Sequence, residues 1–235
     1  MTTALVNFKQ KGFQVLSFPQ HMSSILQVQE ECSRLLLSTG TQKAGIRNLL
    51  GSNSLLTEFC RTGWFFELAQ SVLGNSAQPV RVILFDKSPE ANWSVPWHQD
   101  LSIAVSGEGL PEGYGPRSIK EGVPHIIPPQ RILENMVTLR LHLDPCPLES
   151  GPLVVSPGSH RYGKCKDGEI ATEVLEANPI TCIAELGDVL MMRPLLFHRS
   201  SKAISPTSRK ILHVEYAGVE LDHPLEWWYR EAAKP

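Results

Sequence analysis

The sequence has few of the features that mark a disulfide-stapled, zinc-stapled or membrane-spanning chain. Its 235 residues include five cysteines, an odd number that is spread along the chain without a Cys-x-x-Cys pair. This pattern argues against a disulfide framework and against a structural zinc site. No apolar run approaches the length of a membrane span, and the first residues lack the basic and then apolar profile of a signal peptide. We therefore expect a cytoplasmic chain with no membrane partner.

An excess of one charge is also missing. The 22 Lys and Arg residues nearly balance the 24 Asp and Glu residues, and the formal net charge is -2. No basic field points to nucleic acid, so we expect a small molecule as the partner. The aromatic stretch EWWYR near the C-terminus fits either an interface or packing against the helices. A monomer and a homodimer therefore both remain open.

The order of hydrophobic patterns predicts helices first and a sheet second. Apolar residues recur at three- and four-residue spacing over 21–37, and a second helical pattern runs over 54–73. After Pro79, short β-rich runs alternate with Gly and Pro turn signals. Strands are expected at 80–86, 96–103, 136–144, 153–156, 181–185, 189–192, 195–200 and 209–216. Many short strands favour a sandwich or barrel, and a jelly roll of the cupin type is one such architecture.

We expect a single domain over 1–235. Residues 1–78 would form its mainly helical part, 79–218 its β core and 219–235 a C-terminal tail. The stretch from Ser106 to Gln130 is rich in Gly and Pro and has no periodic pattern. Loops of this length within a compact domain are usually functional or disordered. Residues 104–132 are therefore a candidate lid, with a surface insertion as the alternative.

The stretch VPWHQDL places His98 and Asp100 two residues apart. In an extended segment, side chains at positions i and i+2 point to the same face, so an imidazole and a carboxylate converge. His198, in the β-rich run RPLLFHRSS, can supply a third ligand. Two histidines and one carboxylate on one face of an octahedral ion leave three positions open, which suits non-haem Fe(II) oxygenases. Taken singly, each of these residues fits an ordinary structural role as well.

Arg209 follows His198 by eleven residues and begins the last expected strand. Its guanidinium offers a planar fork that matches a carboxylate, unless it is only a surface charge. Ser200 lies two residues after His198 and hence on the same strand face, where its hydroxyl can reach the same carboxylate.

Five segments together resemble the phytanoyl-CoA dioxygenase family of Fe(II)- and 2-oxoglutarate-dependent oxygenases. They are FDKSPEANWSVPWHQD, GVPHIIPP, TLRLHLDPCPLESGPLVVSPGSHRYGK, MMRPLLFHRSS and SRKILHVEYA, in that order. The likeness covers 80–217, and its specificity lies in the combination of His-x-Asp, the PGSH turn, the distal His and the Arg eleven residues later. It implies a mainly β fold with flanking helices, in which a double-stranded β-helix (jelly-roll, cupin-like) core packs against the N-terminal helices.

The resemblance also implies residue roles. His98, Asp100 and His198 would hold Fe(II), and Arg209, helped by Ser200, would bind the remote carboxylate of 2-oxoglutarate, with O2 as the other co-reactant. Lys87 falls where the family tends to place a further cosubstrate contact. The implied reaction is hydroxylation of an unactivated C–H bond of a small organic substrate, with oxidative decarboxylation of 2-oxoglutarate to succinate and CO2.

The sequence does not identify the substrate. Candidate substrate contacts are Trp97, beside the metal ligands, and Arg140, on an expected inward face, with Arg117 in the candidate lid. Further positions with a possible place at the pocket are Trp93, Lys120, Arg47 and Asn48. Two alternatives remain: a cupin-type hydrolase or isomerase that uses zinc or manganese, and a non-catalytic relative that binds a ligand. His125, His142 and His213 have no spacing that ties them to the triad, and His160 in the PGSH turn is expected to be structural.

Overall fold

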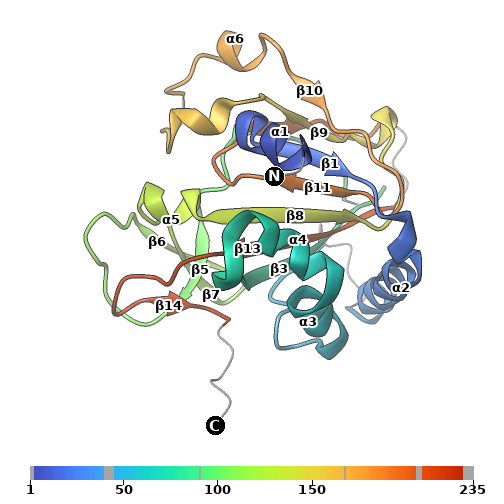
Figure 1. The fold of residues 1–235 in the computed structure, drawn as a ribbon, viewed down its shortest axis with the longest axis horizontal. Coiled ribbons are helices and arrows are strands. Elements are labelled where there is room, and N and C mark those ends of the chain that lie inside the picture. Colours follow the sequence, from blue (N-terminus) through green and yellow to red (C-terminus); the bar gives the residue numbers. More distant parts are fainter. Residues whose placement is uncertain (1–2, 40–44, 90, 167, 205–207, 230–235) are drawn as a thin grey trace.

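The structure is a computed structural model that describes residues 3–39, 45–89, 91–166, 168–204 and 208–229. Helices come first in the chain and antiparallel sheets follow, as the sequence predicts (Figure 1). The α-helices are α1 (Thr3–Lys11), α2 (Met22–Thr39), α3 (Ser54–Arg61), α4 (Gly63–Leu73), α5 (Gln130–Glu134) and α6 (Thr172–Leu175). Within the described residues, no helix combines the length and the apolar character that a membrane crossing requires.

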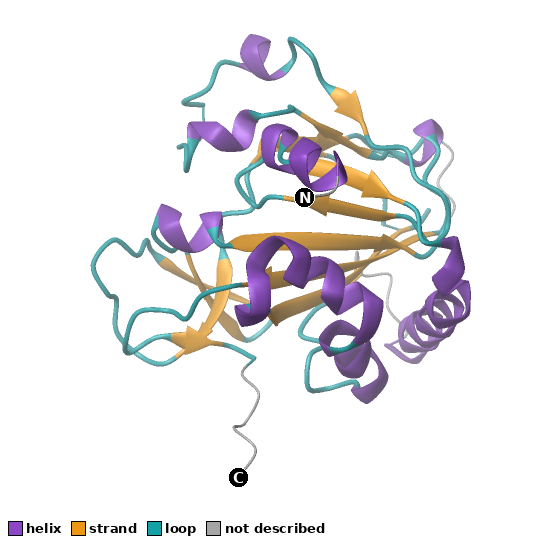
Figure 2. Ribbon diagram, viewed as in Figure 1, coloured by secondary structure: helices purple, strands orange, loops and turns teal. Residues whose placement is uncertain are grey.

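The strands form three antiparallel sheets. The large sheet has the order β1 (Phe13–Leu16), β11 (Val189–Met192), β8 (Met136–His142), β13 (Arg209–Ala217), β3 (Gln78–Lys87) and β2 (Gly45–Ile46). The small sheet has the order β10 (Ile180–Thr181), β9 (Leu153–Val155), β12 (His198–Ser200) and β4 (Val95–His98). The third sheet has the order β14 (Glu226–Trp227), β5 (Ile103–Ser106), β7 (Val123–Ile126) and β6 (Arg117–Lys120), and lies with α5 at one end of the large sheet (Figure 2).

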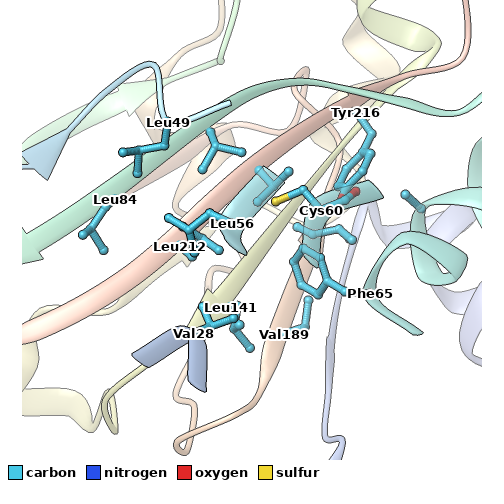
Figure 3. Close-up of a cluster of buried hydrophobic side chains, with 14 of the residues drawn as sticks. Val28, Leu49, Leu56, Cys60, Phe65, Leu84, Leu141, Val189, Leu212 and Tyr216 are labelled. Atoms are coloured by element: carbon cyan, nitrogen blue, oxygen red, sulfur yellow. The ribbon is translucent and has the colours of Figure 1, made fainter. Parts of the chain in front are cut away.

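The two faces of the large sheet differ in chemistry because side chains alternate along each strand. On the outer face, Val82, Leu84 and Leu212 are fully or almost fully buried against α2, α3 and α4 and form the main apolar core (Figure 3). Tyr216 closes one end of this core, where its hydroxyl donates to the Cys60 carbonyl at 2.9 Å. The apolar helical stripes and the apolar strand face thus bury each other, which leaves the opposite face of the sheet for the interior of the barrel.

The inner face carries polar and charged residues over much of its length. On β3 and β13 the inward positions include Arg81, Lys87, Arg209 and His213, and all four are well buried. Toward β11 and β1 the inner face is largely apolar. There a small cluster joins the large and small sheets: Phe13, Val155, Cys182, Leu190, Met192 and Leu196. The barrel is therefore packed at one side and polar at the other, where a ligand can enter.

Two expected helical features are changed in the structure. The helix expected over 54–73 is two helices, because Thr62 is extended and Gly63 adopts a positive φ of 66° between them. This left-handed region favours glycine, which explains the break at this residue. Helix α1 and strand β1 were not predicted. Strand β1 pairs with β11, far away in sequence, and a strand whose partner is so distant carries little local signal.

Two expected β features also differ. The strand expected over 96–103 is wrong, since β4 ends at His98 and β5 begins at Ile103. Asp100 lies between them, and its backbone N–H donates to the Pro194 carbonyl at 2.9 Å. The candidate lid is more regular than expected, because β6 and β7 form a hairpin around Glu121 and Gly122, both at positive φ. Whether this region moves as a lid stays a prediction.

Replacing Leu212 by alanine tests the main core. Leu212 has no exposed surface and lies in the centre of β13, so its loss leaves a cavity. We expect the free energy of unfolding to fall by about 2 to 5 kcal/mol. Leu110→Ala is the matched control, because Leu110 is 58% exposed and its loss should change stability by less than about 0.5 kcal/mol. Urea unfolding of both variants measures the difference, and equal losses would contradict the assigned core.

Candidate metal centre and cavity

Two neighbouring strands of the small sheet bring the histidines together. His98 on β4 lies directly opposite His198 on β12, and their ring centroids are 4.1 Å apart. Asp100 follows β4, and its carboxylate oxygens lie 3.9 Å from His98 Nε2 and 3.7 Å from His198 Nε2. The potential ligand atoms of the three residues all lie within 4.8 Å of one another. One metal ion placed between them can therefore bind all three.

Backbone contacts fix which ring nitrogen each histidine presents. The Nδ1 atoms of His98 and His198 lie 2.9 Å from the carbonyl oxygens of Pro96 and Leu196, each two residues earlier. A carbonyl only accepts, so Nδ1 carries the proton and Nε2 keeps its lone pair. Both Nε2 atoms face Asp100. In metal-binding histidines, a hydrogen bond from the other ring nitrogen to a carbonyl commonly fixes the ring in this way.

The charge states of the triad also suit a metal. Burial opposes ionisation of Asp100, but His198, His213 and His98 outweigh it and hold the pKa of Asp100 well below its usual range. Burial lowers the pKa of His198 to about 4. At neutral pH the site therefore offers a carboxylate and a neutral imidazole, the forms that bind metals.

The triad opens into a cavity of about 290 Å³. Its lining is the polar inner face of the large sheet together with residues from the small and third sheets. Beside the triad it includes Arg47, Arg81, Ile83, Phe85, Trp93, Val95, Lys120, Arg140, Leu153, Ser200, Arg209 and His213. Five of these side chains are Lys or Arg, and Asp100 is the only acid among them. Such a cavity is suited to anionic ligands.

Arg209 is a buried cation without an acidic partner among the described residues. Its side chain is 5% exposed, one Nη donates to the Gly151 carbonyl at 2.7 Å, and its buried Nε has no partner. An uncompensated buried charge is costly, so this part of the cavity favours an anion. Ser200 lines the same part of the cavity. Arg209 and Ser200 would thus suit a ligand carboxylate in the same cavity as a metal.

Lys87 lies next to Arg209 but does not line this cavity. The two residues are opposite each other on β3 and β13. The Lys87 Nζ donates to the Ser201 carbonyl at 2.6 Å and lies 5.3 Å from the Trp93 ring centroid. Burial and the charge of Arg209 lower the pKa of Lys87 to about 8. Its role as a cosubstrate contact stays a prediction.

A buried network that the sequence did not reveal extends from the cavity wall, which includes Arg81, Arg140 and His213. Arg140 donates to Nδ1 of His213 at 2.8 Å, so the Nε2–H of His213 donates to Glu215 at 3.2 Å, and Glu215 is ion-paired with Arg81. Burial and Arg140 keep the pKa of His213 below its usual value, which leaves the ring neutral at neutral pH. Arg140 itself is 8% exposed, and burial together with Arg209 lowers its pKa to about 10.

The other candidate substrate residues lie outside this cavity. Trp97 points to the opposite side of β4, where it lines a second pocket with Cys165 and donates to Glu176 at 3.0 Å. Arg117 donates to the carbonyls of Gly107 and Gly109 within its own surface region. Their roles stay predictions, although their positions do not favour them.

Several other residues have structural contacts. Gln99 is buried on the far side of the metal strand, as expected, where its amide contacts Gly163, Leu195 and Cys165. His160 Nε2 lies 3.3 Å from the Lys9 carbonyl, outside the cavity. Three other residues that the sequence analysis considered do not line the cavity: His125, His142 and Asn48.

Comparisons with known proteins identify the family and the fold. The model of the phytanoyl-CoA dioxygenase (PhyH) family matches residues 20–211. A search of curated proteins finds no match. The structure of EctD from S. alaskensis with 2-oxoglutarate and 5-hydroxyectoine has a TM-score of 0.74 and 18% identity, over 100% of this chain and 85% of that chain.

Two further solved structures are similar in fold. The epimerase SnoN, in complex with Fe3+, alpha ketoglutarate and nogalamycin RO, has a TM-score of 0.69 and 12% identity, over 91% of this chain and 82% of that one. AviO1 from Streptomyces viridochromogenes Tue57 has a TM-score of 0.62 and 19% identity, over 99% and 96%. These likenesses confirm the expected jelly-roll fold with flanking helices. The triad and the cations of the cavity also fit Fe(II) and 2-oxoglutarate. The chain belongs to the phytanoyl-CoA dioxygenase family of non-haem iron, 2-oxoglutarate-dependent enzymes.

Proposed function

We propose that the protein is a dioxygenase that hydroxylates an unactivated C–H bond of a small organic substrate. The observation that carries this proposal is the pairing of a complete His98, Asp100 and His198 triad with the buried guanidinium of Arg209, which has no acidic partner among the described residues, in one cavity. A triad alone suits several metals and reactions. A buried cation in the same cavity adds a need for an anionic cosubstrate.

Each residue has a defined task in this proposal. The Nε2 atoms of His98 and His198 and the carboxylate of Asp100 hold the iron on one face. Arg209 binds the remote carboxylate of 2-oxoglutarate through its planar fork, with Ser200 as a further donor. Bound iron and 2-oxoglutarate together supply the oxidising power, because reduction of O2 is coupled to loss of CO2 and formation of succinate.

Asp100 bears on the type of reaction. Family relatives that halogenate have a small residue at this position, and halide takes the place of the carboxylate. The carboxylate of Asp100 lies within reach of both histidines, so the halide position is filled. We therefore favour hydroxylation. Arg140 lines the cavity and is retained as a proposed substrate contact.

The alternative functions would leave part of this cavity without a role. A zinc or manganese hydrolase or isomerase on the same triad has no need of Arg209. A non-catalytic ligand-binding relative has no need of all three metal ligands. Epimerisation, which the name of SnoN records for that protein, uses the same cofactors and differs only in the fate of the substrate.

Labelled dioxygen tests the proposal. With Fe(II), 2-oxoglutarate and ascorbate, which supplies the two electrons that a substrate C–H bond would otherwise give, the protein is expected to form succinate that carries one oxygen atom from 18O2. When a substrate is added in place of ascorbate, a hydroxylated product would carry the other oxygen atom. The control is the same mixture under argon, which should give no succinate. Succinate without label, or none at all, would contradict a dioxygenase, and labelled succinate beside an unlabelled, isomerised product would favour an epimerase.

A further inference from the structure

The cavity has cations at both ends of the β3–β13 pair. This inference rests on the proposed function and concerns the end that 2-oxoglutarate does not use. Arg209 is opposite Lys87 at one end of the β3–β13 pair, and Arg81 is opposite Glu215 six residues further along each strand. At 3.3 to 3.4 Å per residue these positions are about 20 Å apart. The negative charge of Asp100 acts on Arg81 and on Arg140, which lies opposite His213 between these two positions.

The end remote from Arg209 is built from three different elements. Arg81 is on β3, Lys120 ends β6 and Arg47 follows β2, and all three line the cavity. Arg47 reaches the carboxylate of Glu121 at 3.3 Å and is partly exposed, so it marks the mouth. Lys120 and Arg81 lie further inside, and burial together with Arg81 lowers the pKa of Lys120.

Both inner cations have hydrogen-bonding capacity to spare. The Lys120 ammonium has three donors, of which the one to the Ser102 hydroxyl at 3.0 Å is accounted for. The Arg81 side chain is only 10% exposed, and its buried Nε has no partner although the outer nitrogen binds Glu215. Buried donors are nearly always satisfied, so an acceptor is expected here.

The balance of charge in the cavity also indicates an anionic ligand near Lys120. The two carboxylates of 2-oxoglutarate are matched by Arg209 and by the positive charge that remains on iron after Asp100 has bound it. Glu215 neutralises Arg81, and Glu121 neutralises Arg47. Arg140 and Lys120 are then left without a counter-charge among the described residues that line the cavity. A neutral substrate would leave these two positive charges buried without a counter-charge, whereas an anionic substrate would compensate them in part.

We propose that the substrate is an organic acid whose carboxylate binds to Lys120 and to the guanidinium of Arg81, at the end of the cavity opposite Arg209. The rest of the substrate then lies over Ile83 and His213, which line the cavity and are the next inward pair of β3 and β13 toward Arg209. The carboxylate fixes one end of the molecule and presents a carbon some distance away to the iron.

Binding to the loaded protein under anaerobic conditions tests this subsite. The probes are butanoate, isovalerate and phenylacetate, each compared with its primary amide, which has nearly the same shape without the charge. They are titrated by calorimetry into protein that holds Fe(II) and saturating 2-oxoglutarate, so that Arg209 is already occupied. We expect the acids to bind at least tenfold more tightly than the amides.

Variants of Lys120 separate the subsite from general attraction of anions. Lys120→Met removes the ammonium and should weaken acid binding by about tenfold, and Lys120→Arg should restore most of it. Lys11→Met is the matched control, because Lys11 is an exposed lysine of α1 and lies outside the cavity. Arg81 is left intact, since its loss would leave Glu215 buried and unpaired and threaten folding.

The inference is overturned if the amides bind as tightly as the acids, if Lys120→Met binds the acids like the parent protein, or if none of the acids binds. These outcomes are separate from a failure of the proposed function. Protein that does not form an iron complex with 2-oxoglutarate fails that proposal at the loading step, before any acid is added.

Discussion

Asp100→Ala is expected to lose iron and all turnover. The carboxylate provides one of three ligands and the only negative charge of the triad, and its pKa is held low enough for it to be ionised at any physiological pH. Without it, two histidines alone would face a divalent cation. His98→Ala should have the same outcome, since a single histidine and one carboxylate do not form the three-sided face that iron requires. Iron content after anaerobic loading, and succinate formation, measure the effect.

The control for this substitution is Glu108→Ala, which removes an exposed carboxylate outside the cavity. It should keep full iron content and turnover. Urea unfolding of each variant shows whether the fold is retained. Full activity in folded Asp100→Ala or His98→Ala would mean that the metal is held elsewhere.

Arg209→Ala is expected to weaken the binding of 2-oxoglutarate by at least about 30-fold while iron still binds. Removing one partner of a buried charge pair costs about 2 to 5 kcal/mol, and each 1.4 kcal/mol is about tenfold in affinity. The guanidinium has no acidic partner among the described residues, and we propose that its main task is to bind the cosubstrate. Titration of 2-oxoglutarate into the iron-loaded protein measures the dissociation constant.

Arg34→Ala provides the matched control, because Arg34 is an exposed arginine of α2 that pairs with Glu31. Its affinity for 2-oxoglutarate should equal that of the parent protein. Arg209→Lys should be intermediate, since an ammonium keeps the charge and loses the planar fork. An unchanged affinity in Arg209→Ala would assign the cosubstrate carboxylate to another cation of the cavity.

The three proposed metal ligands could be predicted from the sequence because their signal is local or supported by a resemblance, and the structure brings them together. His98 and Asp100 are two residues apart, and His198 follows in a recognisable run. The sequence argument placed His98 and Asp100 on one face of a single strand. This was only partly right, since Asp100 lies beyond the end of β4. The same alternation that made the triad visible also places Trp97 on the other side of β4, away from the cavity.

The charged wall could not be predicted, because it depends on strand partners. In VRVILFDK the inward residues include Arg81 and Lys87, while Val82 and Leu84 face the helices. Alternating charged and apolar residues usually place the charges in solvent. Here the apolar face is covered by α2 to α4, and the charges point into the barrel. The link from Arg140 to His213 needs the register of β8 against β13, which no local pattern specifies.

The loop region was misjudged for a related reason. Its Gly and Pro residues suggested an irregular segment, but Glu121 and Gly122 make a tight turn that pairs β6 with β7. The pairing of β5 with β14, near the other end of the chain, adds a partner that is remote in sequence. Trp227 is buried there and Trp228 is 44% exposed, so the EWWYR stretch does pack back onto the protein in part.

The central claim is that one cavity binds iron and 2-oxoglutarate together, and anaerobic titration tests it most directly. Fe(II) is added with and without 2-oxoglutarate, and the weak visible charge-transfer band of the chelated keto acid is followed. The band is expected in the parent protein only when 2-oxoglutarate is present, and it should be absent in Arg209→Ala at the same concentration. Iron that binds without producing the band would contradict the claim and would favour a zinc- or manganese-type cupin on the same triad.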